Sequence, residues 1–232
     1  MGFLENCHYG KLSSEIICKC QPFSSENDEG ISSFFHDGNP DNYADYQHEL
    51  MAISHCFYTK EERPRMVCAF SLSNTALRVD VLPKSYRNRF NRKQNIPNNK
   101  RRAQYPAILI GQLCIFDGFG RNALRNEDVG KELMNLIKAI AIDPENSVAA
   151  RYLVVDATNN EQVLNYYKRN GFTFLFSDES EEYENLYDRR IGYVIPPCVQ
   201  RLFIKKRLNE DNRLKTRLML FDLIVLNPGK PA

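Results

Sequence analysis

The stretch of the chain between residues 107 and 142 has the pattern of an anion-binding turn. Residues 107–116 are an apolar run of strand length, and residues 127–142 carry apolar side chains at helical spacing, with glycines and Arg125 in between. A strand that passes through such a loop into a helix presents free backbone N–H groups and the positive end of the helix dipole. The sequence therefore predicts a phosphate-binding turn here.

One alternative for this turn is a dinucleotide site. Gly118, Gly120 and Ala123 have the spacing of the dinucleotide fingerprint, and Asp143 follows twenty residues after Ala123. The helical pattern starts near residue 127, however, so these glycines do not open the helix as that fingerprint requires. A nucleotide-dependent oxidoreductase remains an alternative, which binding of NAD(H) would support.

A second candidate for chemistry is a tyrosine on a short predicted helix. Residues 160–170 have helical character, Asn160 is suited to cap the helix at its start, and Gly171 is suited to end it in a left-handed conformation. The helix carries Tyr167. Taken alone, a helical tyrosine in this position is typical of a core residue, so its role depends on the surrounding motif.

A basic loop at 84–102 breaks the charge balance of an otherwise near-neutral chain. Between Asp80 and Asp117 there are eight cations and no acid, whereas the net charge of the whole chain is only +2. Aromatic residues interleave with the cations, as in surfaces that contact nucleic-acid phosphates. A solvated loop has the same composition, so both interpretations stay open. The cations are Lys84, Arg87, Arg89, Arg92, Lys93, Lys100, Arg101 and Arg102, and the aromatics are Tyr86, Phe90 and Tyr105.

These segments need a sheet to position them. With 232 residues, of which 43% are hydrophobic and 26% charged, the chain can bury a sizeable core. Predicted strands and helices alternate from 107 to 176, which indicates an α/β fold with a mixed central sheet flanked by helices, in a single domain, 1–232. We expect the strand within 107–116 to be central, with the helix from about 127 packed on it.

The remaining elements are predicted from local patterns. Short strands are expected at 15–20 and as a hairpin of 54–59 with 66–72, and closing strands at 172–176 and 217–226. Asp41 is expected to cap a helix that carries Tyr43, Tyr46 and Leu50 on one face. Further predicted elements are a strand at 151–157, a short helix at 85–92 and an insertion at 177–216 before the last strand.

Several classes of protein are excluded by absent patterns. No apolar run approaches the length of a membrane helix, and the first residues lack the basic and apolar parts of a signal peptide. We therefore expect a cytoplasmic protein without a membrane partner. Its seven cysteines are widely spaced and never form a Cys-x-x-Cys pair, which predicts reduced core residues and no metal site.

Two of the segments resemble motifs of the GNAT superfamily of acetyl-CoA-dependent N-acetyltransferases. The sequence from Arg125 to Gly130 is similar to the pyrophosphate loop of that superfamily, although Asp128 replaces a glycine. Residues 160–172 are similar to its tyrosine-bearing helix, with Tyr167 in the tyrosine position. Other segments resemble the toxin-like acetyltransferases of toxin–antitoxin pairs and their relatives. These segments are 35–46, 108–115 and 217–223.

The resemblance implies an activity and its partners. An acetyl group would move from acetyl-CoA, as co-substrate and without a metal, to a primary amine. In the toxin-like relatives the acceptor is the amine of an aminoacyl-tRNA, which the basic loop 84–102 would suit, and a homodimer is compatible with this activity. The charge of Asp128 opposes that of a pyrophosphate, so a non-catalytic binding module on a GNAT-like scaffold stays the alternative.

Roles for individual residues follow from the same resemblance. The backbone of Leu113, Cys114 and Ile115 would pair with the pantetheine arm, and one of the N–H groups would polarise the thioester carbonyl. Tyr167 would protonate the departing thiolate, and Asn160 would cap its helix and contact the cofactor arm. The residues that would hold the pyrophosphate are Arg125, Asn126, Glu127, Asp128, Val129, Gly130 and Lys131.

Overall fold

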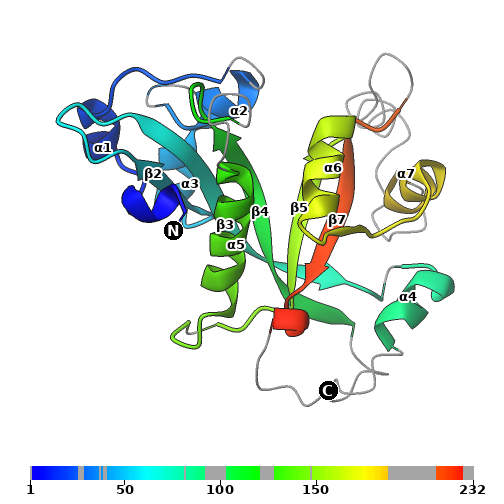
Figure 1. Cartoon of the computed structure of the whole chain (residues 1–232). Coiled ribbons are helices and arrows are strands. Elements are labelled where there is room, and N and C mark those ends of the chain that lie inside the picture. Colours follow the sequence, from blue (N-terminus) through cyan, green and yellow to red (C-terminus); the bar gives the residue numbers. More distant parts are fainter. Residues whose placement is uncertain are drawn as a thin grey trace. The chain divides into compact units, whose positions relative to one another are not determined.

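A computed structural model describes most of the chain. The described residues are 2–25, 29–36, 38, 41–80, 82–91, 103–120, 128–146, 148–187 and 213–226. Figure 1 shows the helices and strands coloured along the sequence. Contacts between Cα atoms group the chain into two compact units. Unit 1 comprises Met1–Thr75 and Ile108–Ala149, and unit 2 comprises Ala76–Ala107 and Ala150–Ala232. The single domain 1–232 stays a prediction.

The described strands form a seven-stranded mixed sheet, which confirms the predicted α/β class. Its strand order is β1-β2-β3-β4-β5-β7-β6, so the strand expected at 107–116 is the fourth of the seven and is central, as predicted. The strands are β1 (His8–Lys11), β2 (Ile53–Tyr58), β3 (Met66–Arg78), β4 (Gln104–Ile115), β5 (Tyr152–Thr158), β6 (Thr173–Phe174) and β7 (Thr216–Asp222).

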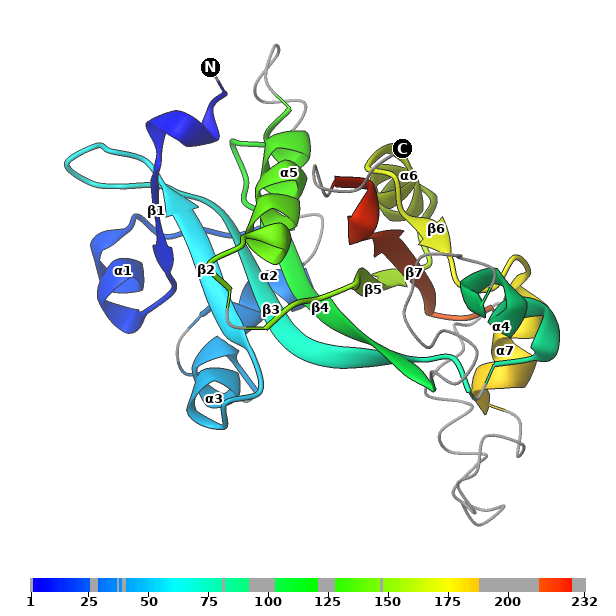
Figure 2. The same cartoon turned by 90° about the horizontal axis from the view of Figure 1, so that it is seen from below.

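Unit 1 has helices on both faces of its strands. The predicted hairpin is confirmed, because β2 and β3 pair antiparallel with Ile53 opposite Leu72. Helix α5 (Val129–Ile142) lies along β3 and β4 and buries Leu133, Met134 and Ile137, while α3 (Tyr43–His48) lies on the opposite face (Figure 2). A buried cluster on the α3 side joins Leu12, Phe35, Tyr43, Cys56, Met66, Ala69, Cys114 and Phe116.

The predicted strand at 15–20 is wrong, since these residues belong to helix α1 (Ser14–Lys19). The side chain of Ser13 caps this helix by accepting a hydrogen bond from the Ile16 N–H at 3.4 Å. An ion pair between Glu15 and Lys19 joins successive turns at 2.5 Å. The cap and the charge pair therefore outweigh the strand preference of the two isoleucines. A second short helix, α2 (Glu29–Phe34), follows in the same unit.

Helix α3 is present as predicted, but its cap is the residue after the expected one. The side chain of Asn42 accepts hydrogen bonds from the amides of Ala44 and Asp45, whereas Asp41 has φ +56°. Leu50 lies beyond the helix, also at φ +56°, and is 92% exposed. The expected apolar face therefore ends with the helix at His48.

The described part of unit 2 has three α-helices. The predicted helices at 85–92 and 160–170 are confirmed as α4 (Lys84–Asn91) and α6 (Glu161–Arg169). The predicted closing strands pair antiparallel as β6 and β7, and β7 also pairs antiparallel with β5, with Tyr152 opposite Asp222. The last residues of the segment predicted as a strand to 226 form a 3-10 helix, Leu223–Leu226.

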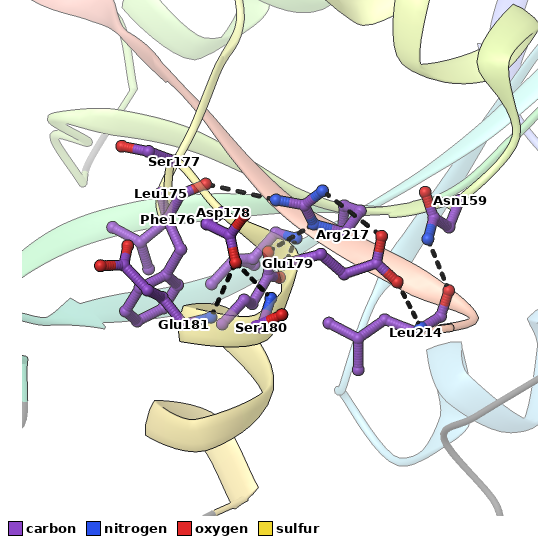
Figure 3. Close-up of polar contacts among 12 residues, drawn as sticks. Asn159, Leu175, Phe176, Ser177, Asp178, Glu179, Ser180, Glu181, Leu214 and Arg217 are labelled. Carbon is purple, nitrogen blue, oxygen red and sulfur yellow. Dashed lines mark hydrogen bonds and ion pairs between the residues drawn. The ribbon is translucent and has the colours of Figure 1, made fainter. Parts of the chain in front are cut away.

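The described part of the 177–216 insertion contains an acidic helix, α7 (Glu179–Tyr187), which polar contacts tie to β7 (Figure 3). The Nε of Arg217 donates to Glu182 Oε2 at 2.6 Å, and the Leu218 N–H donates to Glu182 Oε1 at 2.7 Å. Glu179 accepts from the Leu214 N–H at 2.6 Å. Burial raises the pKa of Glu182 above its ordinary value, while Arg217 and the Leu218 amide act in the opposite direction.

The six described cysteines are free, and three of them are in the core. Cys56, Cys68 and Cys114 are buried, whereas Cys18 is exposed and Cys198 lies outside the described residues. Burial raises the pKa of Cys68 well above its ordinary value. Within the described ranges, no helix has the length and apolar character needed to cross a membrane.

Candidate functional site

Strand β4 carries one residue more than the stretch of chain that pairs with it. The Val79 N–H donates to the Ala103 carbonyl oxygen at 2.9 Å, and the Phe116 N–H donates to the Val67 carbonyl oxygen at 3.0 Å. Val79 lies twelve positions after Val67, whereas Phe116 lies thirteen positions after Ala103. The Asp80 N–H donates to the same Ala103 oxygen at 3.1 Å, so the pairing is irregular at that end as well. From the difference of one position we infer a β-bulge in β4, a feature that is common next to binding sites.

We place this bulge at Gly111. The N–H of the next residue, Gln112, donates to the hydroxyl oxygen of the buried Ser71 at 2.9 Å. A Cβ at position 111 would lie only 2.9 Å from that same oxygen, so a larger residue there would displace the Ser71 hydroxyl. The sequence analysis missed this bulge, although a glycine inside a strand pattern is its usual signal.

The predicted pantetheine residues follow directly after the bulge. Successive amides of a strand point to opposite edges, and that of Phe116 points at β3. The amides of Leu113 and Ile115 therefore point away from β3, to the side of β4 on which β5 follows in the strand order. The side chains of these two residues are half-buried, whereas Cys114 is 4% exposed and packs in the core. The geometry thus fits a backbone role for Leu113 and Ile115 and a packing role for the thiol.

Asp128, which stands where the pyrophosphate loop of the GNAT superfamily has a glycine, caps the start of α5. Asp128 Oδ1 accepts a hydrogen bond from the Lys131 N–H at 3.0 Å. Val129, the first residue of the helix, has no acceptor for its amide within the helix. Val129 is 2% exposed, and the cap places a carboxylate at the same helix start. Arg125, Asn126 and Glu127 lie outside the described residues.

Residues 117–120, which follow β4, and the first turn of α5 are each held by contacts with other parts of unit 1. After β4, the Asp117 N–H donates to the Ser24 carbonyl oxygen at 2.9 Å, and Phe119 is buried. The guanidinium of Arg65 lies 4.8 Å from the centre of the Phe119 ring. At the other end, Glu132 in the first turn of α5 accepts two hydrogen bonds from the backbone of residues 3 and 4. The sequence analysis gave Glu132 no role.

Asn160 caps α6 as predicted. Its side-chain oxygen accepts a hydrogen bond from the Gln162 N–H at 2.8 Å. The neighbouring Asn159 has a different partner, since its side-chain Nδ2 donates to the Leu214 carbonyl oxygen at 2.7 Å. A third bond, from the Asn159 N–H to the Lys215 carbonyl oxygen at 2.8 Å, completes the attachment. The start of α6 is thereby fixed to the chain just before β7.

Tyr167 is buried in unit 2, on α6. Its ring centre lies 5.2 Å from that of Tyr166 and 5.3 Å from that of Phe172, with both pairs close to perpendicular. Burial raises the pKa of Tyr167 above its ordinary value, so its phenol keeps the proton across the physiological pH range. The surroundings therefore suit both a core tyrosine and a proton donor.

The structure distributes the predicted site residues between the two units. Leu113 to Ile115 and Asp128 to Lys131 belong to unit 1, where one strand, one loop and one helix start follow each other along the chain. Asn160 and Tyr167 belong to unit 2.

We expect Asp128→Asn to tighten acetyl-CoA binding roughly fivefold, because like charges about 4 Å apart repel by about 1 kcal/mol in water-like surroundings. Asparagine caps helices as well as aspartate does, so the helix start should be retained. Calorimetry at low and high salt measures the change, and the gain should shrink as salt screens it. Unchanged affinity at low salt would show that this carboxylate does not face the bound anion.

Comparison with known proteins gives structural matches only. No protein-family model matches the sequence, and no curated protein matches it. A structure of the toxin AtaT, in a tyrosine-to-phenylalanine mutant, matches with 13% identity and a TM-score of 0.49, covering 98% of this chain and 97% of that one.

Two further solved structures match over less of the chain. An AtaTR structure bound with AcCoA matches with 17% identity and a TM-score of 0.48, covering 78% of this chain and 91% of that one. A tyrosine-to-phenylalanine mutant of KacT matches with 16% identity and a TM-score of 0.48, covering 72% of this chain and 86% of that one. The AtaT structure is that of a toxin, the AtaTR structure holds AcCoA, and all three TM-scores are below 0.5.

Proposed function

We propose that this chain is an N-acetyltransferase that moves an acetyl group from acetyl-CoA to a primary amine. The observation that carries the proposal is the order of features in unit 1. Strand β4 ends in two amides, those of Leu113 and Ile115, that point away from β3. A loop then leads into the start of α5, where Val129 and Gly130 are buried. This arrangement suits an extended arm that ends in a phosphate group.

The amides after the bulge have a defined part in the proposed reaction. A pantetheine arm that pairs with Leu113 and Ile115 would run along this end of β4. One of these N–H groups would then donate to the thioester carbonyl oxygen, on which negative charge develops as the amine attacks. The amide of Val129 and the positive end of α5 would hold the pyrophosphate.

Proton transfer in this proposal uses Tyr167. The amine nitrogen forms the new C–N bond, the C–S bond breaks, and the departing thiolate takes the phenolic proton. The amine loses its own proton to solvent, from which the phenolate of Tyr167 is reprotonated. An α-amino group with a pKa of about 8 is partly neutral at pH 7, so no separate general base is required.

Calorimetric titration with acetyl-CoA tests the proposal directly. We expect saturable binding of acetyl-CoA by the wild-type chain, and none of NAD(H). Absence of binding at near-millimolar acetyl-CoA would instead favour the non-catalytic module on a GNAT-like scaffold. Binding of NAD(H) in place of acetyl-CoA would favour the oxidoreductase.

We expect kcat/KM to rise with pH and to level off above the pKa of the acceptor amine, about 8 for an α-amino group. Because burial raises the pKa of Tyr167, the acid form persists on the alkaline side and gives no falling limb below about pH 10. A pH profile of kcat/KM for the amine, at saturating acetyl-CoA, measures this. A falling limb between about pH 8 and 9 would contradict Tyr167 as the proton donor.

We propose an aminoacyl-tRNA as the acceptor, on the strength of the cations in the basic loop 84–102. Within α4, Arg87 and Arg89 are exposed, while Arg101 and Arg102 lie outside the described residues. Transfer to a charged tRNA should fall steeply with salt, and transfer to a free amino-acid amide should not. Equal salt dependence for the two acceptors would indicate that residues 84–102 are a solvated loop that does not contact the tRNA.

A further inference from the structure

The N-terminal segment is bonded to the first turn of α5 through a single carboxylate. Glu132 Oε1 accepts from the Phe3 N–H at 3.1 Å, and Oε2 accepts from the Leu4 N–H at 2.9 Å. Leu4–Asn6 form a 3-10 helix that contacts α5. A Cβ at position 2 would lie 2.5 Å from Glu132 Oε2, so glycine permits the segment to lie against this carboxylate.

The same segment also contacts the loop on the other side of the proposed phosphate site. The Phe3 ring centre lies 5.7 Å from that of Phe119, which is 3% exposed and stands after the end of β4. Arg65 covers the Phe119 ring at 4.8 Å. Residues 3–6 therefore contact both the described end of the loop and the start of the helix that follows it. We call residues 3–6 the N-terminal strap.

We infer that Glu132 is a positioning residue that, through the N-terminal strap, fixes the start of α5 for the pyrophosphate of the cofactor. The inference rests on the proposed function and deepens it. Both carboxylate oxygens of Glu132 accept hydrogen bonds from backbone amides, so this side chain connects the N-terminal strap to helix α5 at two points. It lies four residues after Asp128, within the helix turn whose amides would receive the phosphate.

Electrostatics and positioning predict opposite effects for Glu132→Gln. Removing a negative charge beside an anion site should tighten acetyl-CoA binding if charge alone matters. The glutamine amide has one acceptor oxygen and a donor NH₂, so one of the two strap hydrogen bonds is lost. If the strap positions the site, acetyl-CoA should bind more weakly despite the more favourable charge.

The test compares acetyl-CoA with S-acetylpantetheine, which lacks the pyrophosphate. We expect Glu132→Gln to raise the Kd for acetyl-CoA about tenfold, the usual order for loss of a hydrogen bond to a charged group, and to leave that for S-acetylpantetheine unchanged. Phe3→Ala removes the Phe3 ring that contacts Phe119 but keeps both backbone hydrogen bonds to Glu132. It should likewise raise the Kd for acetyl-CoA and leave that for S-acetylpantetheine unchanged. Asn42→Ala, which removes the α3 cap in the same unit, is the control for general destabilisation.

Each outcome bears on one idea. Tighter or unchanged acetyl-CoA binding by Glu132→Gln, with the wild type binding normally, overturns the positioning role and leaves the proposed function standing. Equal weakening for both ligands, or the same pattern in Asn42→Ala, reduces Glu132 to a structural contact. Failure of the wild type to bind acetyl-CoA removes the proposed function itself.

Discussion

Tyr167→Phe should lower kcat by about two to four powers of ten, the usual range for loss of a general acid. The change keeps the ring between Tyr166 and Phe172 and deletes only the hydroxyl. Acetyl-CoA affinity and thermal stability should therefore stay near those of the wild type. Steady-state kinetics at saturating acetyl-CoA, with whichever amine proves to be an acceptor, measure the effect.

Tyr166→Phe is the matched control, since its ring neighbours that of Tyr167 on the same helix. It should change kcat little, because no proton transfer is assigned to that residue. Equal and small effects of the two substitutions would remove Tyr167 from the catalytic machinery. Together with the carboxylate of Asp128 at the helix start, that result would favour the non-catalytic module.

The long elements of the fold could be predicted because their apolar spacing is decided by burial. Leu133 and Ile137 lie one helical turn apart on α5, and both are fully buried. The alternating or continuous apolar runs of β3, β4 and β5 gave strands for the same reason. Where one face of an element must be buried, the sequence pattern and the structure agree.

Local polar contacts explain most of the differences between the elements predicted from apolar periodicity and those in the structure. In α1 no residue is buried, so apolar spacing carried no information, and the Ser13 cap determined the outcome. The cap of α3 falls on Asn42 because its amide oxygen can bond two successive N–H groups, while Asp41 adopts a left-handed backbone. Such choices differ by about 1 kcal/mol or less, and periodicity does not resolve them.

The sequence motifs point to residues for the candidate site but not to their geometry. Leu113, Ile115 and the start of α5 stay predictions, and the bulge inferred at Gly111 involves the hydroxyl of Ser71, forty residues away in sequence. The role of Glu132 likewise depends on residues 3 and 4. Long-range contacts of single polar groups leave no periodic trace, so they emerge only from the folded chain.

Breaking the attachment of α7 should have the largest effect on stability. The Glu182 side chain is 1% exposed and that of Arg217 is 8% exposed, and Nε and Oε2 are 2.6 Å apart. Arg217 also donates to the Phe176 carbonyl oxygen at 3.3 Å, whereas Glu179 is 3.9 Å from it. Glu182→Leu therefore leaves a buried guanidinium without its main counter-charge and should cost about 3–5 kcal/mol in the free energy of unfolding.

The double variant Glu182→Leu with Arg217→Met separates charge from packing. It removes the unpaired cation and fills the space with apolar atoms, so much of the lost stability should return, because a buried ion pair contributes little beyond an apolar pair of similar volume. Denaturant unfolding of the wild type, both single variants and the double variant gives the coupling energy. If the double variant lost the sum of the two single losses, the cation would not be the cause of the damage. The Leu218 amide, which loses its acceptor in both Glu182 variants, would then account for it.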